Sequence, residues 1–225
     1  VSQQFLQSHF DSMKNLLTGA FDRIDELHRE SGKLRGVPTG FFELDNKLAG
    51  LQKSDLIIIA ARPSMGKTSL ALDIARQVAV NSNLPVGIFS LEMSKEQLVD
   101  KMLCAQAEVD LWKMRTGKLS DREDIGGQSD FSRIGHAMGR LSEAQIFIDD
   151  SPTANVMEIR TKARRLQAEH NVGLIVLDYL QLMESASASD NRVQIVSEIS
   201  RGLKAIAREI NVPFVALSQL SRQVE

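Results

Sequence analysis

One segment, Ala61–Thr68 (ARPSMGKT), limits the folds open to this chain more than any other stretch. It follows an apolar run, Leu56–Ala60, that predicts a β-strand, and it leads into Ser69–Val80, which predicts a helix. The segment matches the phosphate-binding loop G-x-x-x-x-G-K-[ST] except at its first position, where Ala61 stands in place of glycine. A strand, a loop of this type and a helix in succession are typical of α/β proteins that bind a nucleoside triphosphate.

Each residue type in this loop suits a triphosphate. The backbone N–H groups and the helix N-terminus donate to phosphate oxygens, and Gly66 permits their close approach. Lys67 can reach the β- and γ-phosphates, and the Thr68 hydroxyl can ligate Mg²⁺. A chance Gly-Lys-Thr at a helix start is the alternative, which the strand and helix on either side disfavour. The expected nucleotide-binding residues are Ala61, Arg62, Pro63, Ser64, Met65, Gly66, Lys67, Thr68 and Ser69.

Short apolar runs alternate with helical stretches along the rest of the chain, which predicts an α/β fold with a mainly parallel sheet between helices. The runs are continuously apolar, so we expect every strand to be buried on both faces. The expected strands are Leu56–Ala60, Val86–Leu91, Ile146–Ile148, Leu174–Leu177 and Pro213–Leu217. Helices are expected near residues 67–80, 94–107, 131–143, 155–169 and 193–210, with Ser94 and Gln97 as a capping box for the second.

A magnesium site beside the loop needs a carboxylate at the end of a neighbouring strand. Two stretches compete: Leu174–Asp178 (LIVLD) and Ile146–Asp150 (IFIDD). We favour Asp178, because its apolar run is longer and ends in a single acid. Asp149 and Asp150 precede a Ser-Pro turn and have an alternative role in capping it.

Hydrolysis also needs a group that orients or deprotonates water near the γ-phosphate. Glu92 follows the expected strand 86–91, and strand C-terminal ends face the ligand crevice in a parallel sheet. Its alternative is an exposed or helix-capping acid before Ser94. Gln219 follows another strand end, and the pattern leaves open whether it senses the γ-phosphate or is an ordinary loop glutamine.

The N-terminal part predicts an amphipathic helix over residues 11–29, followed by a turn-rich segment, 31–40. An isolated helix cannot hide its apolar stripe, so the stripe must pack against a neighbouring copy or, alternatively, against its own domain. The candidate interface residues are Met13, Leu16, Leu17, Phe21, Ile24 and Leu27.

Composition excludes several other classes. A net charge of −2 requires any nucleic-acid surface to be local, and the one cysteine, Cys104, excludes an internal disulfide. Apolar runs are too short to span a membrane, and the N-terminus lacks the pattern of a secretory signal, so we expect a cytoplasmic protein. The polar segment 185–192 is either a flexible linker or a loop that follows a phosphate backbone.

Together, several motifs resemble the ATPase domain of bacterial replicative DNA helicases of the DnaB type, in which alanine at the first loop position is usual. The similarity extends from about residue 11 to the end of the sequence. The matching stretches are Gly36–Asp45 (GVPTGFFELD), Leu56–Ser69 (LIIIAARPSMGKTS), Phe89–Ser94 (FSLEMS), Arg115–Leu119 (RTGKL), Asp178–Met183 (DYLQLM) and Ala216–Arg222 (ALSQLSR).

The resemblance implies a RecA-like domain over residues 36–225, preceded by a linker region over 1–35 whose helix docks on a neighbouring subunit. It implies ATP and Mg²⁺ as cofactors, a homo-hexameric ring around single-stranded DNA, and a primase and a helicase loader as partners. It assigns Lys67 and Thr68 to phosphate and magnesium, Asp178 to the magnesium shell, Glu92 to water activation and Gln219 to the γ-phosphate. The segment resembling the loop that lines the channel contains Ser187, Ser189, Asn191 and Arg192.

In the family that the chain resembles, a trans-acting arginine finger and the final strands lie beyond the position of Glu225, so we expect the domain to be incomplete at its C-terminus and this fragment to lack ATPase activity by itself. Two rival functions remain at this point. One is a RecA- or RadA-like recombinase, which would form open filaments rather than closed rings. The other is a nucleotide-dependent loading module that keeps Lys67 without catalysing turnover.

Overall fold

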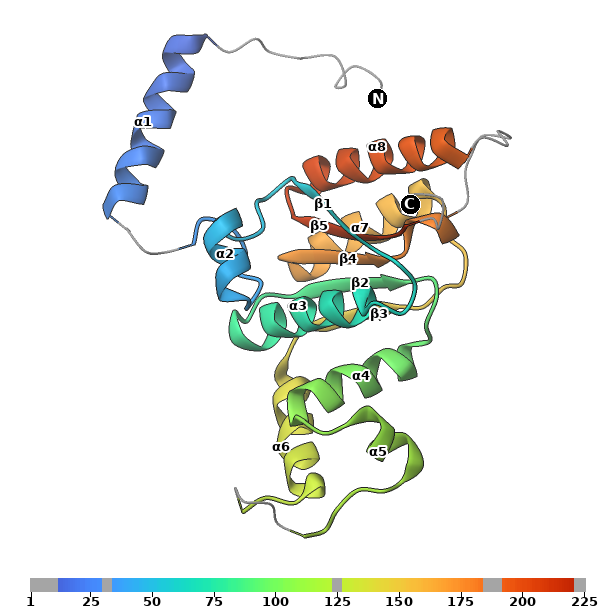
Figure 1. Cartoon of the computed structure of the whole chain (residues 1–225). Helices are drawn as coiled ribbons and strands as arrows, with labels where there is room; N and C mark the ends of the chain where they lie inside the picture. Colours follow the sequence, from blue (N-terminus) through green and yellow to red (C-terminus); the bar gives the residue numbers. More distant parts are fainter. Residues whose placement is uncertain (1–11, 30–33, 123–126, 184–191, 221–225) are drawn as a thin grey trace. The chain divides into compact units, whose positions relative to one another are not determined.

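The computed structural model describes residues 12–29, 34–122, 127–183 and 192–220 (Figure 1). The chain divides into two compact units, residues 1–35 and 36–225. In the described ranges, no helix is long and apolar enough to cross a membrane.

The first unit contains one described helix, α1 (Met13–Arg29). It begins within two residues of the expected start, and residue 11 lies outside the described ranges. Four apolar side chains recur at helical spacing and remain exposed: Met13, Leu17, Phe21 and Ile24. The helix is therefore amphipathic with its described apolar side chains open to solvent.

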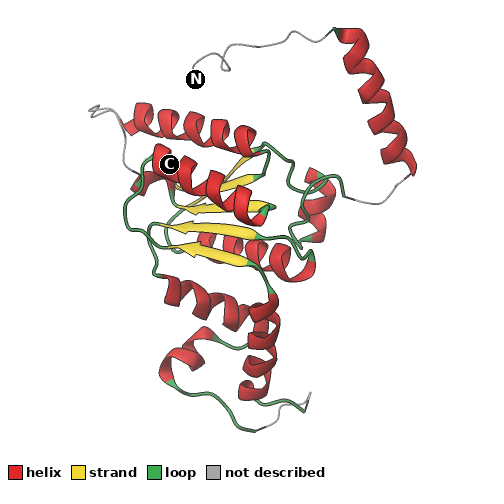
Figure 2. Cartoon of the chain, turned by 180° about the vertical axis from the view of Figure 1, so that it is seen from behind, coloured by secondary structure: helices red, strands yellow, loops and turns green. Residues whose placement is uncertain are grey.

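Within the described residues of the second unit, five parallel strands form one sheet in the order β1-β5-β4-β2-β3 (Figure 2). Each connection between consecutive strands contains a helix, as parallel pairing requires. All strand C-termini therefore lie at the same edge of the sheet. The strands are β1 (Leu56–Ala61), β2 (Val86–Ser90), β3 (Ile146–Asp149), β4 (Leu174–Asp178) and β5 (Phe214–Gln219).

Helices cover both faces of this sheet (Figures 1 and 2). Those expected from the sequence begin and end within one residue of the expected limits, and Ser94 with Gln97 forms the expected capping box. The short elements α2, α5 and η1 were not expected. The helices are α2 (Phe42–Leu48), α3 (Lys67–Asn81), α4 (Lys95–Ala107), α5 (Leu111–Thr116), α6 (Asp130–Glu143), α7 (Val156–His170), α8 (Arg192–Ile210) and the 3-10 turn η1 (Leu180–Leu182).

The core lies in two layers, one on each face of the sheet, because alternate side chains of a strand point to opposite faces. On one face Ile175 and Phe214 lie in a cluster with residues of α7 and α8. On the other, Val176 and Val215 lie in a cluster with residues of α3 and α4. Both layers hold the C-terminal ends of β4 and β5 in fixed positions.

The expectation that every strand is buried on both faces is wrong for the two edge strands. β2 and β4 are buried along their whole length, whereas β1 and β3 are only partly buried, and the Ile58 side chain is 44% exposed. Strand order decides burial, and β1 and β3 each have one neighbouring strand in the described sheet.

The motif Gly36–Asp45 forms a compact turn around a buried carboxylate. Asp45 accepts hydrogen bonds from the Thr39 backbone N–H and hydroxyl, both at 2.8 Å, and from the Gly40 N–H at 3.2 Å. A Cβ on Gly36 would lie 2.5 Å from the Leu51 carbonyl oxygen, so the close pairing of these segments requires glycine there. The motif thus secures the start of the second unit.

Candidate nucleotide-binding site

The loop between β1 and α3 presents its backbone at the C-terminal edge of the sheet. Arg62 to Gly66 are exposed, and Gly66 adopts a φ of 82° as the N-cap of α3. Helix α3 begins directly after it, and the Leu70 N–H donates to the Gly66 carbonyl at 2.9 Å. The preceding N–H groups of this first turn have no partner within the helix, which makes the loop suited to an anion.

The buried Asp178 carboxylate lies beside the first two residues of α3. Its Oδ2 accepts a hydrogen bond from Thr68 Oγ1 at 2.7 Å, and its Oδ1 is 3.2 Å from Lys67 Nζ. The side chain is only 4% exposed, so Lys67 supplies the countercharge that a buried carboxylate needs. The end of β4 and the start of α3 therefore form one charged centre.

Glu92 lies two residues beyond β2, on a short turn with internal support. Ser90 Oγ accepts from the Met93 N–H at 3.1 Å and donates to the Met93 carbonyl at 2.7 Å, while the Leu91 N–H donates to the Asp178 carbonyl at 2.7 Å. Glu92 Oε2 lies 3.6 Å from Lys67 Nζ, and the carboxylate remains half exposed. This position leaves it accessible to water and ligand.

A third group contacts Lys67: its Nζ lies 3.9 Å from the centroid of the Tyr179 ring. The attraction between a cation and an aromatic face helps to fix the ammonium group. Sequence reasoning missed Tyr179, although its position directly after Asp178 was a usable signal.

The competing acids Asp149 and Asp150 have other partners. Asp149 accepts from the Ser151 N–H at 3.0 Å and pairs with Lys162 at 2.6 Å, whereas Asp150 accepts from the Lys95 N–H at 3.1 Å, at the start of α4. Burial alone would raise the pKa of Asp149, but the hydrogen bonds from Lys162 and Ser151 hold it below its usual value. Both acids thus serve local turns and helix ends.

Gln219 is the last residue of β5 and lies in register with Ala61, the first residue of the loop. The Leu220 N–H donates to the Ala61 carbonyl at 3.0 Å, so the two segments stay together past the strand end. The Gln219 side chain is exposed. Its position is beside the phosphate loop.

The predicted DNA-contact residues Ser187, Ser189 and Asn191 lie outside the described residues. Arg192 begins α8, and its side chain is not described. The same holds for the side chains of Leu16 and Leu27 in the predicted helix interface.

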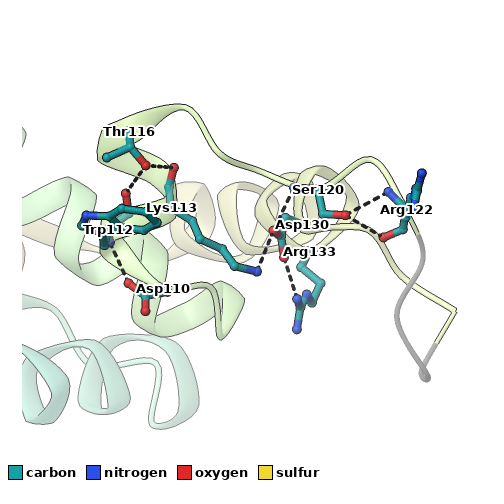
Figure 3. A network of polar contacts seen from close by, with 8 residues as sticks. All are labelled: Asp110, Trp112, Lys113, Thr116, Ser120, Arg122, Asp130 and Arg133. Atoms are coloured by element: carbon teal, nitrogen blue, oxygen red, sulfur yellow. Dashed lines mark hydrogen bonds and ion pairs between the residues drawn. The ribbon is translucent and has the colours of Figure 1, made fainter.

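The motif Arg115–Leu119 lies away from this site, in the lobe formed by α4, α5 and α6. A polar network centred on Asp130 holds it there (Figure 3). The Asp130 carboxylate accepts from the Ser120 N–H at 3.0 Å, from Arg133 at 2.7 Å and from Lys113 at 3.2 Å. These hydrogen bonds, the Ser120 one first, lower the pKa of Asp130 to about 2. Sequence reasoning also missed this residue.

Comparison with known proteins decides the family. Residues 36–225 match the family described as "DnaB-like helicase C terminal domain". The chain belongs to this DnaB-like family. Its RecA-like α/β fold is therefore that of a P-loop NTPase, as expected from the sequence.

The replicative DNA helicase DnaB of Geobacillus stearothermophilus is 51% identical over 226 residues, which cover 100% of this chain and 48% of that helicase. The DnaB-like chain thus spans about half the length of this relative. Among solved structures, the ATPase domain of G40P is 35% identical with a TM-score of 0.84, covering 96% of this chain and 74% of that one. A DnaB-like replicative helicase described with its interactions with primase is 35% identical with a TM-score of 0.82, covering 95% and 50%.

Proposed function

We propose that this chain is the motor domain of a replicative DNA helicase, which couples ATP hydrolysis to translocation on single-stranded DNA and to duplex unwinding as a ring. The observation that carries the proposal is the cluster of Lys67, Thr68, Glu92 and Asp178 at the C-terminal edge of the sheet in a DnaB-like chain. Strand ends at this edge are where α/β folds bind nucleotides.

In this proposal the phosphates of ATP lie on the loop Ala61–Ser69. The N–H groups at the start of α3 donate to phosphate oxygens, and Gly66 leaves its approach free of side-chain atoms. Lys67 exchanges part of its contact with Asp178 and Glu92 for the β- and γ-phosphates. The similarity to the ATPase domain of G40P supports ATP as the nucleotide.

Thr68 and Asp178 fit a magnesium ion. Their oxygens lie 2.7 Å apart, and hydroxyl and carboxylate oxygens are the donors that Mg²⁺ prefers. Mg²⁺ in nucleotide sites is held by one or two protein oxygens and takes its other ligands from phosphates and water. When bound, the ion would neutralise charge on the transferring phosphoryl group.

Glu92 is proposed to hold and deprotonate the attacking water. Its carboxylate is half exposed and 3.6 Å from the lysine proposed to contact the γ-phosphate. Gln219 extends from the adjacent strand end and is proposed to sense the γ-phosphate by hydrogen bonding.

Single-stranded DNA is the proposed track, contacted through Ser187, Ser189, Asn191 and Arg192. A homo-hexamer is the proposed assembly, with a primase and a helicase loader as partners. The DnaB-like replicative helicase described with its interactions with primase supports a primase as partner.

Strand separation on forked DNA by the full-length protein with ATP and Mg²⁺ tests the function. We expect unwinding by the parent, and we expect Lys67→Ala to abolish it with at least a ~100-fold loss of nucleotide affinity by calorimetry, since Lys67 is the cation proposed to contact the β- and γ-phosphates. Lys53→Ala, at an exposed lysine before β1, is the matched control and should behave as the parent. A parent that binds nucleotide and DNA but shows no turnover would indicate a loading module, and open filaments would indicate a recombinase.

A further inference from the structure

Three side chains hold the Lys67 ammonium group, and Tyr179 differs from the other two in being an aromatic ring rather than a carboxylate. Lys67 Nζ lies 3.9 Å from the centroid of the Tyr179 ring, 3.2 Å from Asp178 Oδ1 and 3.6 Å from Glu92 Oε2. The Lys67 side chain is only 9% exposed, so water does little to weaken its attraction to the ring. The ring is therefore a substantial part of what fixes this ammonium group.

The Tyr179 ring is itself held in place, by packing and by the backbone on either side of it. It packs against the core layer on the face of the sheet that α3 and α4 cover. The Tyr179 carbonyl accepts a hydrogen bond from the Leu182 N–H at 3.1 Å, and the preceding Asp178 carbonyl accepts one from the Leu91 N–H at 2.7 Å. The aromatic face is thus a fixed platform for a flexible lysine.

The two carboxylates cannot serve Lys67 in the same way once ATP is bound. In the proposed ATP complex, Asp178 lies in the magnesium shell and Glu92 acts on water, so both have other partners. Each carboxylate also competes with the phosphates for the ammonium group, because all of these groups are anionic. The face of an aromatic ring attracts a cation through its quadrupole and adds no net negative charge beside the triphosphate. It can therefore keep Lys67 in place without opposing nucleotide binding.

We propose that Tyr179 is a positioning residue for ATP binding, whose ring holds the Lys67 ammonium group where it reaches the β- and γ-phosphates. This inference rests on the proposed function. A lysine side chain has a long, flexible stem, and confining it before the nucleotide arrives lowers the entropy cost of binding. The affinity for ATP therefore depends on the electron density of the ring face.

Substitution of Tyr179 in the full-length protein tests this contact, with ATP affinity measured by calorimetry. We expect Tyr179→Leu, which keeps an apolar side chain but removes the aromatic face, to weaken ATP binding about tenfold. Tyr179→Phe keeps the face and should stay within about twofold of the parent. Equal losses of affinity in the two variants would overturn the inference.

Trp112→Leu is the matched control for Tyr179→Leu. It removes the ring that contacts another lysine, with Lys118 Nζ at 4.7 Å from the ring centroid, in the lobe away from the site. The affinity of this variant for ATP should equal that of the parent, because its lysine is not the one proposed to contact phosphate. A loss as large as that of Tyr179→Leu would show a general effect of removing a ring and would overturn the inference.

A series of fluorinated phenylalanines at position 179 separates positioning of Lys67 from a structural role. Fluorine atoms draw electron density from the ring face and weaken its attraction to a cation, while the ring keeps nearly the same shape. We expect ATP affinity to fall stepwise as fluorine atoms are added, with the Tm staying that of the Tyr179→Phe protein. An affinity that does not depend on fluorination would overturn the inference, and the series answers the question even if Tyr179→Leu does not fold.

The Lys67→Ala background identifies the partner of the ring. Without the ammonium group the ring has no cation to hold, so Tyr179→Leu should change the ATP affinity of the Lys67→Ala protein by less than about twofold. A further loss of about tenfold in that background would overturn the inference, because Tyr179 would then act on the nucleotide by another route.

Failure of the inference can be told apart from failure of the proposed function. A parent protein that binds no ATP, or that does not unwind forked DNA, contradicts the proposed function and the inference with it. A parent that unwinds DNA, with an ATP affinity insensitive to fluorination at position 179, contradicts only the role of Tyr179.

Discussion

The Glu92 carboxylate is the acid proposed to activate water, and its amide isostere tests that role. We expect Glu92→Gln to bind ATP within a few-fold of the parent and to lose hydrolysis by at least ~100-fold, because the amide keeps the shape but cannot accept the proton. Single-turnover hydrolysis and calorimetric binding, both on the full-length protein, measure the two effects.

Glu96→Gln is the control for this substitution. Glu96 lies in the first turn of α4, and the hydrogen bonds from the backbone and from Ser94 lower its pKa. Its change should leave turnover unaltered. Parent-like hydrolysis by Glu92→Gln would remove Glu92 from the mechanism.

Some residues of the site can be predicted from local sequence patterns, whereas others depend on tertiary contacts. The strand–loop–helix pattern indicates Lys67 and Thr68, and strand ends indicate Asp178 and Glu92, because parallel strands end at one edge. Their chemical roles stay predictions. The hydrogen bonds between Gln181, in η1, and Gln219 could not be predicted in the same way. They depend on how far β5 extends past the end of β4.

At the level of elements, long segments are predictable and short ones are not. The helices and strands with several turns or a full apolar run begin and end close to their expected limits, because periodic burial shows in the sequence. Helix α5 (Leu111–Thr116) has six residues, too few to show a helical period. Its caps were nevertheless a signal: Asp110 accepts from the Trp112 N–H, and Gly117 has a φ of 67°.

Asp130 ties α5 and α6 together, and its pKa gives the lobe a defined acid sensitivity. The pKa is lowered from 3.8 to about 2 in the folded protein, first by the Ser120 N–H and then by Arg133. A lowered folded pKa means that the carboxylate stabilises the fold above pH ~3.9 and that this contribution is lost as the pH falls towards 2.

We therefore expect Asp130→Asn to lower the Tm at pH 7 by at least about 3 °C, because Lys113 and Arg133 lose their partner. The difference in Tm between the parent and the variant should shrink between pH 4 and pH 2. Thermal unfolding followed by circular dichroism across this range measures both. Asp121→Asn, at an exposed aspartate nearby, should match the parent at every pH, and a pH-independent difference for Asp130→Asn would contradict the assignment.

At the scale of the whole molecule, a net charge of −2 limits how DNA can be held. We expect binding to unrelated single strands with similar affinity, because a motor that crosses every sequence contacts the backbone. Log affinity should fall linearly with log salt, with a slope of about −0.7 for each phosphate neutralised.

Arg192→Ala should weaken DNA binding and make this slope shallower, since Arg192 is the cation proposed to contact the backbone. Arg208→Ala, near the other end of α8, removes the same charge and should change neither quantity. Fluorescence anisotropy with two unrelated oligonucleotides over a salt series measures them. A strong preference for one sequence would contradict backbone recognition.

Helix α1 presents exposed apolar side chains that could join subunits. Phe21 and Ile24 are 71% and 63% exposed, and a helix of this length is marginal alone in water. Burial of a large apolar side chain contributes ~1.5–3 kcal/mol, so a few such residues can hold subunits together. We propose that this face packs on a neighbouring copy, and we expect the full-length Phe21→Asp, Ile24→Asp protein, or one lacking residues 1–30, to shift towards monomer in light scattering at matched concentration.

Lys14→Gln with Arg29→Gln is the control for this pair of substitutions. It changes the net charge by the same −2 but leaves the exposed apolar side chains of α1 in place. Its mass should remain that of the parent, because the apolar face is intact, so a shift confined to the Phe21→Asp, Ile24→Asp protein would identify apolar packing rather than charge repulsion as the cause. If the apolar variants keep the parent mass, α1 packs against its own chain, and the proposed ring must be held by other surfaces of the full-length protein.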